Sequence, residues 1–198
     1  RMGPRLRGDD RLVMMTAMHF PTPADVLAFW RHAGTDKWYT KDEAFDAEVR
    51  RRFLGLWERA AAGDLTLWEA TDDGALALVI ALDQFPRNMF RGDARTFSTD
   101  AKALEVASGA IARGADKRID PGLVEFLYMP FMHSERLADQ ERCIALFQGG
   151  GRPDNVRFAE IHADIIRRFG RFPHRNELLG RTTTAEERAF LDAGGFSG

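Results

Sequence analysis

The sequence predicts an all-α fold of about eight helices and no sheet. Helix-start signals recur along the chain, apolar residues repeat at helical spacing, and alternating β-branched runs hardly occur. A length of 198 residues fits one domain. We therefore expect a single helical domain over residues 19–198, preceded over residues 1–18 by a disordered or vector-derived leader.

The first two helices have distinct start signals. Thr22 followed by Pro23 places a cap residue and a proline at the first helical position. Thr40 with Glu43 three residues later is close to a capping box for the next helix, which should end at Gly63. The apolar stripe of that helix is Phe45, Val49, Phe53, Leu56, Trp57 and Ala60.

The uninterrupted apolar run from Ala75 to Leu82 is compatible with a buried strand or a buried helix, because periodicity alone does not separate the two. Alanine and leucine dominate the run over β-branched residues. Asp72 and Asp73 suit the first turn of a helix. We therefore predict a buried helix that Pro86 ends.

The middle of the chain repeats these signals. Thr99 should cap a helix that stops before Gly114. Pro121 should open the next helix. Ser134 should begin a helix that runs to Phe147, and the glycine-rich segment GGGRPDN should form the loop after it.

Three further starts are expected near the C-terminus. Asp154 should cap a long helix. Pro173 should open a short helix, HRNELLG, and Thr183 with Glu186 forms a capping box for the last helix. The residues of the long helix that should face the core are Phe158, Ile161, Ile165 and Phe169.

Composition narrows the functional classes. Lys and Arg total 28 against 30 Asp and Glu, which argues against a domain that binds nucleic acid with its whole surface. The one cysteine, Cys143, excludes an internal disulfide framework, fits a reducing compartment and lies in an apolar run typical of a buried thiol. No apolar run approaches the roughly 18 residues of a membrane span. We expect a cytoplasmic protein that binds neither nucleic acid nor membrane.

Three segments place polar groups where the apolar pattern predicts core. The first, LDQFPRNMFRG, carries Asp83, Arg87, Asn88 and Arg91 around the end of the buried run. Buried charges of this kind are costly unless they pair. The segment therefore holds either a structural ion pair or a ligand site.

The second segment, LYMPFMHSE, ends in His133 and Glu135. A histidine among aromatic and methionine residues is either a hydrogen-bonded core residue or part of a site. The pair is not a metal signature, because zinc sites need three or four ligands at helix or hairpin spacing. We expect neither a metal nor a cofactor.

The third segment, HADIIRRFGRFPHRN, contains His162 on the inward flank of its helix and ends with His174 and Arg175 in a predicted helix first turn. The helix dipole disfavours cations there by a few tenths to ~1 kcal/mol each, whereas free N–H groups favour an anion. We predict that Arg171 and Arg175 hold an anion, either a ligand or an internal carboxylate. The internal candidates are Asp83, Glu135 and Glu177.

One shared polar site satisfies these groups at lower cost than three separate sites. The three segments should therefore converge in space. Asp83 should lie within reach of an arginine, and His133 or His162 should line the same cavity.

The segments DQFPRNMFRG, PFMHSE, LADQER and FGRFPHRNELLGR resemble the bacterial domain-of-unknown-function family 924. Further matches at VLAFW, Trp38 to Asp46 and FLDAGGF extend the resemblance over nearly residues 24–196. It implies helix hairpins in a tetratricopeptide-like, right-handed superhelix, and it implies no activity. Arg136 departs from the acidic residue expected after HSE. The residues that match the family motif are Asp83, Gln84, Arg87, Asn88, Arg91, His133, Glu135, His162, Arg168, Arg171, His174, Arg175 and Asn176.

Three functions stay open at this point. The first is a scaffold that binds a small anionic molecule or a peptide carboxylate. The second is a hydrolase or transferase on an anionic substrate, with His133 or His162 as general base and Glu135 or Asp83 as the carboxylate that orients it. The third is a protein-interaction module whose charged groups pair internally. The ligand-binding candidates are Arg87, Asn88, Arg91, Arg168, Arg171, His174, Arg175 and Asn176.

Overall fold

The computed structural model describes residues 20–150 and 152–196, and within these ranges it contains helices and no strand. The all-α prediction is confirmed, whereas the right-handed superhelix stays a prediction. The expected leader over residues 1–18 lies outside the described residues. The α-helices are α1 (Pro23–Ala33), α2 (Thr35–Trp38), α3 (Glu43–Ala62), α4 (Asp72–Val79), α5 (Phe85–Met89), α6 (Asp100–Ala112), α7 (Val124–His133), α8 (Leu137–Gly149), α9 (Pro153–Phe169) and α10 (Ala185–Asp192).

Shorter helical turns connect several of these helices. A π-helical turn, η2 (Ile80–Gln84), joins α4 to α5. The others are 3₁₀ turns: η1 (Thr66–Ala70), η3 (Ala94–Phe97), η4 (Ala115–Lys117) and η5 (Pro173–Arg175). None of the helices in the described part of the chain is long and apolar enough to cross a membrane.

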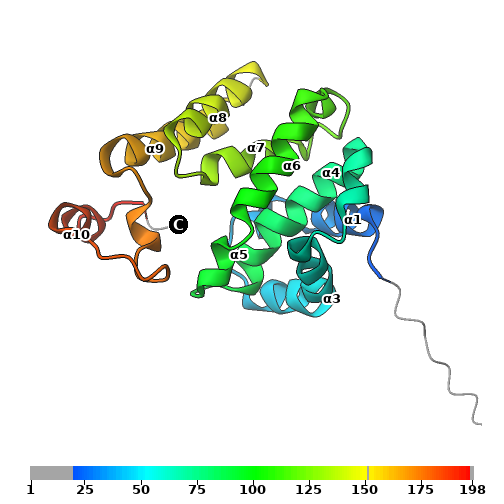
Figure 1. The fold of residues 1–198 in the computed structure, drawn as a ribbon, viewed down its shortest axis with the longest axis horizontal. Helices are drawn as coiled ribbons and strands as arrows, with labels where there is room; N and C mark the ends of the chain where they lie inside the picture. Colours follow the sequence, from blue (N-terminus) through cyan, green and yellow to red (C-terminus); the bar gives the residue numbers. More distant parts are fainter. Residues whose placement is uncertain (1–19, 151, 197–198) are drawn as a thin grey trace, which may run out of the picture.

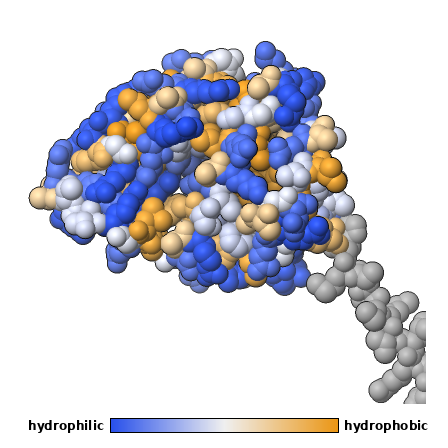
Figure 2. All heavy atoms as spheres, viewed as in Figure 1, coloured by the Kyte–Doolittle hydropathy of each residue, from blue (hydrophilic) through white to orange (hydrophobic). Residues whose placement is uncertain are grey.

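The helices form a larger group, α1 to α6, and a smaller group, α8 to α10, with α7 between them (Figure 1). One large apolar core extends from α1 to the start of α9. A second, small core of Ile165, Ile166 and Phe172 joins the end of α9 to α10. Hydrophilic residues cover most of the face in view, with smaller apolar groups between them (Figure 2).

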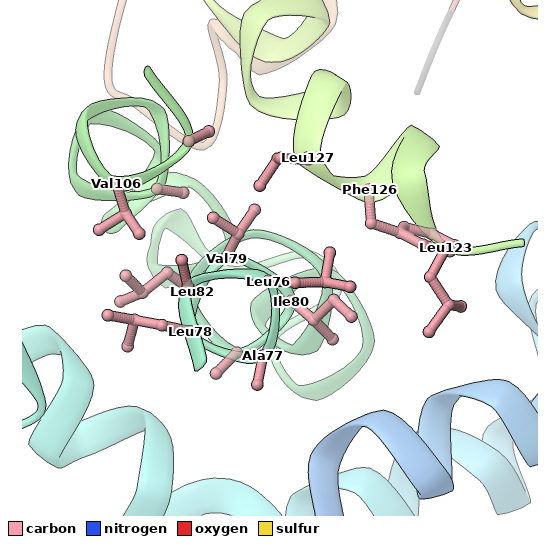
Figure 3. Close-up of a cluster of buried hydrophobic side chains, with 14 of the residues drawn as sticks. Leu76, Ala77, Leu78, Val79, Ile80, Leu82, Val106, Leu123, Phe126 and Leu127 are labelled. Atoms are coloured by element: carbon pink, nitrogen blue, oxygen red, sulfur yellow. The ribbon is translucent and has the colours of Figure 1, made fainter. Parts of the chain in front are cut away.

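Helix α4 and the turn η2 (Ile80–Gln84) run through the centre of the large core. Every residue from Gly74 to Gln84 is buried. The side chains therefore point in all directions, toward Val106 of α6 and Leu127 of α7 among others (Figure 3). The predicted buried helix is confirmed. It carries Asp83 into the interior, where that carboxylate needs partners.

Pro86 does not end the buried helix, contrary to expectation. In η2 the backbone hydrogen bonds join residues five apart, instead of four apart as in an α-helix. The N–H group of Phe85 therefore donates to the carbonyl of Ile80. This wider turn starts a new helical register in which Pro86 lies in the first turn of α5, where its missing N–H costs little. The chain leaves the helix only at Phe90.

The early caps are partly as predicted. Thr22 forms a full capping box with Asp25, and Gly63 ends α3 in the left-handed conformation. The cap of α3 is Asp42 instead of Thr40, because the Asp42 carboxylate accepts from the N–H group of Phe45. The shift leaves the predicted stripe in place, since Val49, Phe53, Leu56 and Ala60 are buried.

The caps of the later helices differ more from the predicted ones. Thr99 precedes α6, but its hydroxyl donates to the carbonyl of Leu82 and so joins α6 to the central helix. Helices α7 and α8 begin three residues after Pro121 and Ser134. Asp154 lies in the first turn of α9, after the cap residue Arg152.

The last capping box is shifted by one residue. It consists of Thr184 and Glu187, whereas Thr183 and Glu186 were expected. Both pairs have the same spacing. The choice depends on Glu187 being the glutamate that turns inward, where it is buried.

The predicted inward face of helix α9 is confirmed for Ile165, which is 3% exposed, and for Phe169, which packs against the small core, but not for its first two residues. Phe158 is 56% exposed and Ile161 is 38% exposed. The buried residues include Ala159 and Ala163, whose small side chains allow close approach to a neighbouring helix. The true inward face also contains His162, which brings that imidazole to the site described next.

Candidate functional site: a cavity lined by histidines and arginines

A cavity of about 350 Å³ lies where the larger helix group meets the C-terminal group. Its polar wall consists of Arg87, Arg91, His133, His162, His174 and Arg175. Aromatic side chains, Phe97, Phe172 and Phe196, form much of the rest. All three charged segments contribute, so the predicted convergence is confirmed.

Asp83 and His133 form a carboxylate–imidazole pair at one end of the cavity. Oδ1 of Asp83 lies 2.7 Å from Nδ1 of His133, and Asp83 is fully buried. Burial by itself raises the pKa of Asp83, but Arg87, His133 and Gln84 outweigh it and lower the pKa to about 2. An ionised carboxylate only accepts hydrogen bonds, so Nδ1 of His133 carries the proton.

His133 is therefore a neutral imidazole with its other nitrogen free. Burial and the neighbouring Arg87 lower its pKa, against the opposing effect of Asp83. No described residue hydrogen-bonds Nε2, and the side chain, 12% exposed, lines the cavity. Nε2 thus offers a lone pair to the cavity.

His162 and His174 line the same cavity. Nδ1 of His162 lies 2.8 Å from the carbonyl oxygen of Phe158, which only accepts, so this nitrogen also carries the proton. Nδ1 of His174 is buried and has no hydrogen-bond partner in the part of the chain that the structure describes. Burial lowers the pKa of both imidazoles to about 4, and in His174 the charge of Arg175 adds to the effect. Both rings are neutral at pH 7.

Two of the three cavity arginines have carboxylates of their own. Arg87 makes two parallel hydrogen bonds to Asp100, at 2.9 and 3.0 Å, and its Nη1 lies 3.4 Å from Asp83. Nε of Arg91 lies 2.6 Å from Asp46. The prediction that Asp83 lies within reach of an arginine is confirmed.

Arg175 has no carboxylate of its own among the described residues. Its guanidinium carbon lies 4.5 Å from the ring centroids of both Phe97 and Phe172, so two aromatic side chains hold it. Its one carboxylate contact within residues 20–150 and 152–196 is 3.4 Å, to the Asp100 oxygen that Arg87 already binds. The Nε atom is buried, and no residue in these ranges accepts a hydrogen bond from it. Burial and the charge of Arg87 lower the pKa of Arg175 to about 10, which leaves it protonated at pH 7.

The expected helix after Pro173 is a 3₁₀ turn of three residues, followed by further turns. The helix-dipole argument therefore does not apply to Arg175. What places the arginine at the cavity is its packing between the two phenylalanines, where the turn leaves it 7% exposed.

Several predicted ligand residues point elsewhere. Arg171 binds Glu187 with Nε at 2.6 Å and Nη2 at 2.9 Å. Asn176 also donates to Glu187, at 3.2 Å. Arg168 is exposed and lies over the ring of Phe169. These groups stabilise the packing of α10 and do not line the cavity.

Asn88 and Glu135 are also engaged outside the cavity. Asn88 donates to Asp46, at 2.7 Å. Glu135 accepts from Arg181 at 2.7 and 3.0 Å and from the backbone N–H of Phe172. Glu135 contacts no histidine among the described residues, so Asp83 is the carboxylate that orients an imidazole. Glu177, a candidate internal partner, is exposed.

Asp100, Asp46 and Glu187 are partners of these arginines that the sequence pattern did not predict. Asp100 directly follows Thr99 in the first turn of the expected helix, and Asp46 lies on the polar side of a predicted stripe. Asp46 reaches Arg91 because α3 packs against α5, and Asp100 reaches Arg87 because α6 packs against η2. Glu187 reaches Arg171 from α10. Within residues 20–150 and 152–196, no group of three or more His, Cys, Asp and Glu residues is placed to hold a metal ion.

Residues 26–195 match the family described as bacterial protein of unknown function (DUF924). The chain belongs to this family. A solved structure of a protein of unknown function from Agrobacterium tumefaciens is 46% identical to this DUF924 member, with a TM-score of 0.83. The match covers 87% of this chain and 97% of the Agrobacterium chain. No curated protein matches.

Proposed function

We propose that the cavity binds a small anionic molecule, with Arg175 as the principal anion-binding group. The supporting observation is a guanidinium that is buried, held between two aromatic rings and not fully hydrogen-bonded by the described residues. Ordering and desolvating an arginine is costly, and an incoming carboxylate or phosphate would recover that cost through charge-assisted hydrogen bonds. A pre-ordered side chain also loses little entropy on binding.

The formal charges near Arg175 sum to zero, because Arg87 and Arg175 are opposed by Asp83 and Asp100. Binding would therefore depend on directed hydrogen bonds more than on a surplus of positive charge. A volume of about 350 Å³ suits a small metabolite or the terminal residue of a peptide. The interaction-module alternative is less favoured, since complete internal pairing would leave no open cavity beside the cluster.

The test is thermal stabilisation by phosphate and sulfate, with chloride at matched ionic strength as a control for screening. An anion at 100 times its Kd stabilises the native state by about 2.7 kcal/mol, which raises the Tm measurably. Arg175→Gln should abolish this shift. Arg167→Gln, which changes an exposed arginine on α9, should keep it.

A second variant guards against misfolding of Arg175→Gln. Leu178→Trp adds bulk at the cavity wall without replacing a charged residue, and it should also abolish the shift. Far-ultraviolet circular dichroism establishes that each variant is folded. Equal Tm shifts from all three anions, or an undiminished phosphate effect in both cavity variants, would contradict the proposal.

The Asp83–His133 pair supports a second candidate, an enzyme that acts on the bound anion. A neutral imidazole whose Nδ1–H is held by a carboxylate is oriented to accept a proton at Nε2, the arrangement of a general base. His162 has a carbonyl in place of that carboxylate, which favours His133 for the role. A screen of ester and phosphate-ester substrates tests this candidate. Any activity found should fall by about 10²–10⁴-fold in His133→Gln.

A further inference from the structure

We infer that the cavity selects a hydroxylated anion, whose hydroxyl donates to Nε2 of His133 while its carboxylate or phosphate accepts from Arg175. This inference rests on the proposed anion binding and adds a second requirement to it. The requirement follows from which atoms of the cavity wall donate hydrogen bonds and which accept them.

Two imidazoles present acceptors to the cavity. The Nδ1–H groups of His133 and His162 are committed to Asp83 and to the carbonyl of Phe158, at 2.7 and 2.8 Å. Each ring therefore has an unprotonated Nε2. Neither Nε2 atom has a hydrogen-bond partner among residues 20–150 and 152–196, and both rings line the cavity.

These acceptors do not become donors at neutral pH. The pKa of His162 is lowered to about 4 by burial, and that of His133 is lowered by burial and by Arg87. A second proton on His133 would also place its positive charge beside Arg87, an effect that together with burial outweighs the attraction of Asp83 and Asp100. The wall thus combines guanidinium donors with imidazole lone pairs.

An anion without a hydroxyl group would pair with the donors of this wall and leave its acceptors without partners. Its oxygens would accept from Arg175, but any oxygen turned toward His133 would meet another lone pair. An ammonium group would supply the missing donor, but the described lining of the cavity presents arginines and no carboxylate to it. A hydroxyl group supplies a donor without charge. A small molecule with a hydroxyl near a carboxylate or phosphate therefore fits the wall best.

The test uses matched probes that differ by one group. Lactate is compared with propionate, and glycerol 3-phosphate with propyl phosphate, by isothermal titration calorimetry at pH 7. One of the two pairs, the carboxylates or the phosphates, will carry the anion that the cavity prefers. In that pair the hydroxylated probe should bind at least about tenfold more tightly than the deoxy probe, a difference of about 1.4 kcal/mol. An acceptor-only analogue, 2-methoxypropionate, should show no gain over propionate.

His133→Phe should remove the hydroxyl preference, so that within this variant the hydroxylated and the deoxy probe bind with equal affinity. His32→Phe, at an exposed position on α1, should keep the preference. The wild-type protein supplies a readout that needs no variant and no ligand. Long-range ¹H–¹⁵N correlation spectra at pH 7 should show His133 and His162 neutral and protonated at Nδ1.

The outcomes separate the two proposals. If phosphate does not stabilise the protein specifically, anion binding itself is wrong. If phosphate stabilises it but the hydroxylated probes bind no better than the deoxy probes, or do not bind, only the inference about the hydroxyl is wrong. Spectra that place the proton of His133 on Nε2 would also overturn it.

Discussion

Acidification from pH 7 to pH 5 should destabilise the protein through His162. The imidazole is 7% exposed, between Phe172 and Phe196, and it shares the cavity with His133 on α7, Arg87 on α5 and His174 and Arg175 on η5. Its pKa is about 4 in the folded chain, against 6.5 for an unperturbed histidine. The folded state thus disfavours the proton that the unfolded state takes up.

The sign and the size of the change in unfolding free energy follow from this difference in pKa. A lowered histidine pKa contributes stability that is fully present above pH 6.5 and is lost as the pH falls toward 4. At pH 5 the unfolded histidine is about 1.5 pH units below its pKa, whereas the folded one is still mostly neutral. At 1.36 kcal/mol per unit, the loss due to His162 is about 2 kcal/mol.

Urea unfolding followed by circular dichroism at pH 7 and pH 5 measures this loss. The wild type and His32→Gln, which changes an exposed histidine, should each lose about 2 kcal/mol more than His162→Gln. His133 and His174 add to the loss in all three proteins, so the comparison isolates His162. If His162→Gln loses as much as the wild type, His162 is not held neutral and the tautomer reasoning fails with it.

Three other predictions concern packing. Glu187→Ala should cost about 3 kcal/mol of unfolding free energy in a urea titration, because it leaves Arg171 without its buried carboxylate, whereas Glu186→Ala at an exposed position should cost little. Burial raises the pKa of Cys143 to about 12, so an aromatic disulfide reagent at pH 7.5 should find no reactive thiol until urea is added. Phe158→Ser should change stability by less than about 0.5 kcal/mol, whereas Ala163→Leu should cost about 1–3 kcal/mol by overpacking; the reverse order would contradict the observed face of α9.

Local rules explain why most helices were predictable. A capping residue, its hydrogen bond and the apolar stripe behind it lie within a few turns of one another, as in Thr22 to Trp30 or Val49 to Ala60. The errors arose where an alternative local solution exists. Asp42 competes with Thr40 as a cap, and a π turn allows the chain to continue through Pro86.

The convergence of the site was also predictable, because buried charges need partners. Asp83 follows a run that had to be interior, so an arginine or histidine had to reach it. Which one reaches it was not predictable. The choice between Glu135 and Asp83 as the partner of His133 depends on the placement of α7 beside η2, and no residue spacing encodes that placement.

The sequence by itself determined the helical class, the buried central helix and the need for a shared polar site, since each follows from short-range hydrogen bonding or from the cost of a buried charge. Only the tertiary structure decided which arginine keeps hydrogen-bond donors that no carboxylate of the protein fully occupies. Arg171 and Arg175 are equivalent in sequence terms, yet the inward turn of Glu187 neutralises the first, and Phe97 and Phe172 hold the second at the cavity. Ion pairing depends on distances of a few ångströms between segments far apart in the chain, and packing sets those distances.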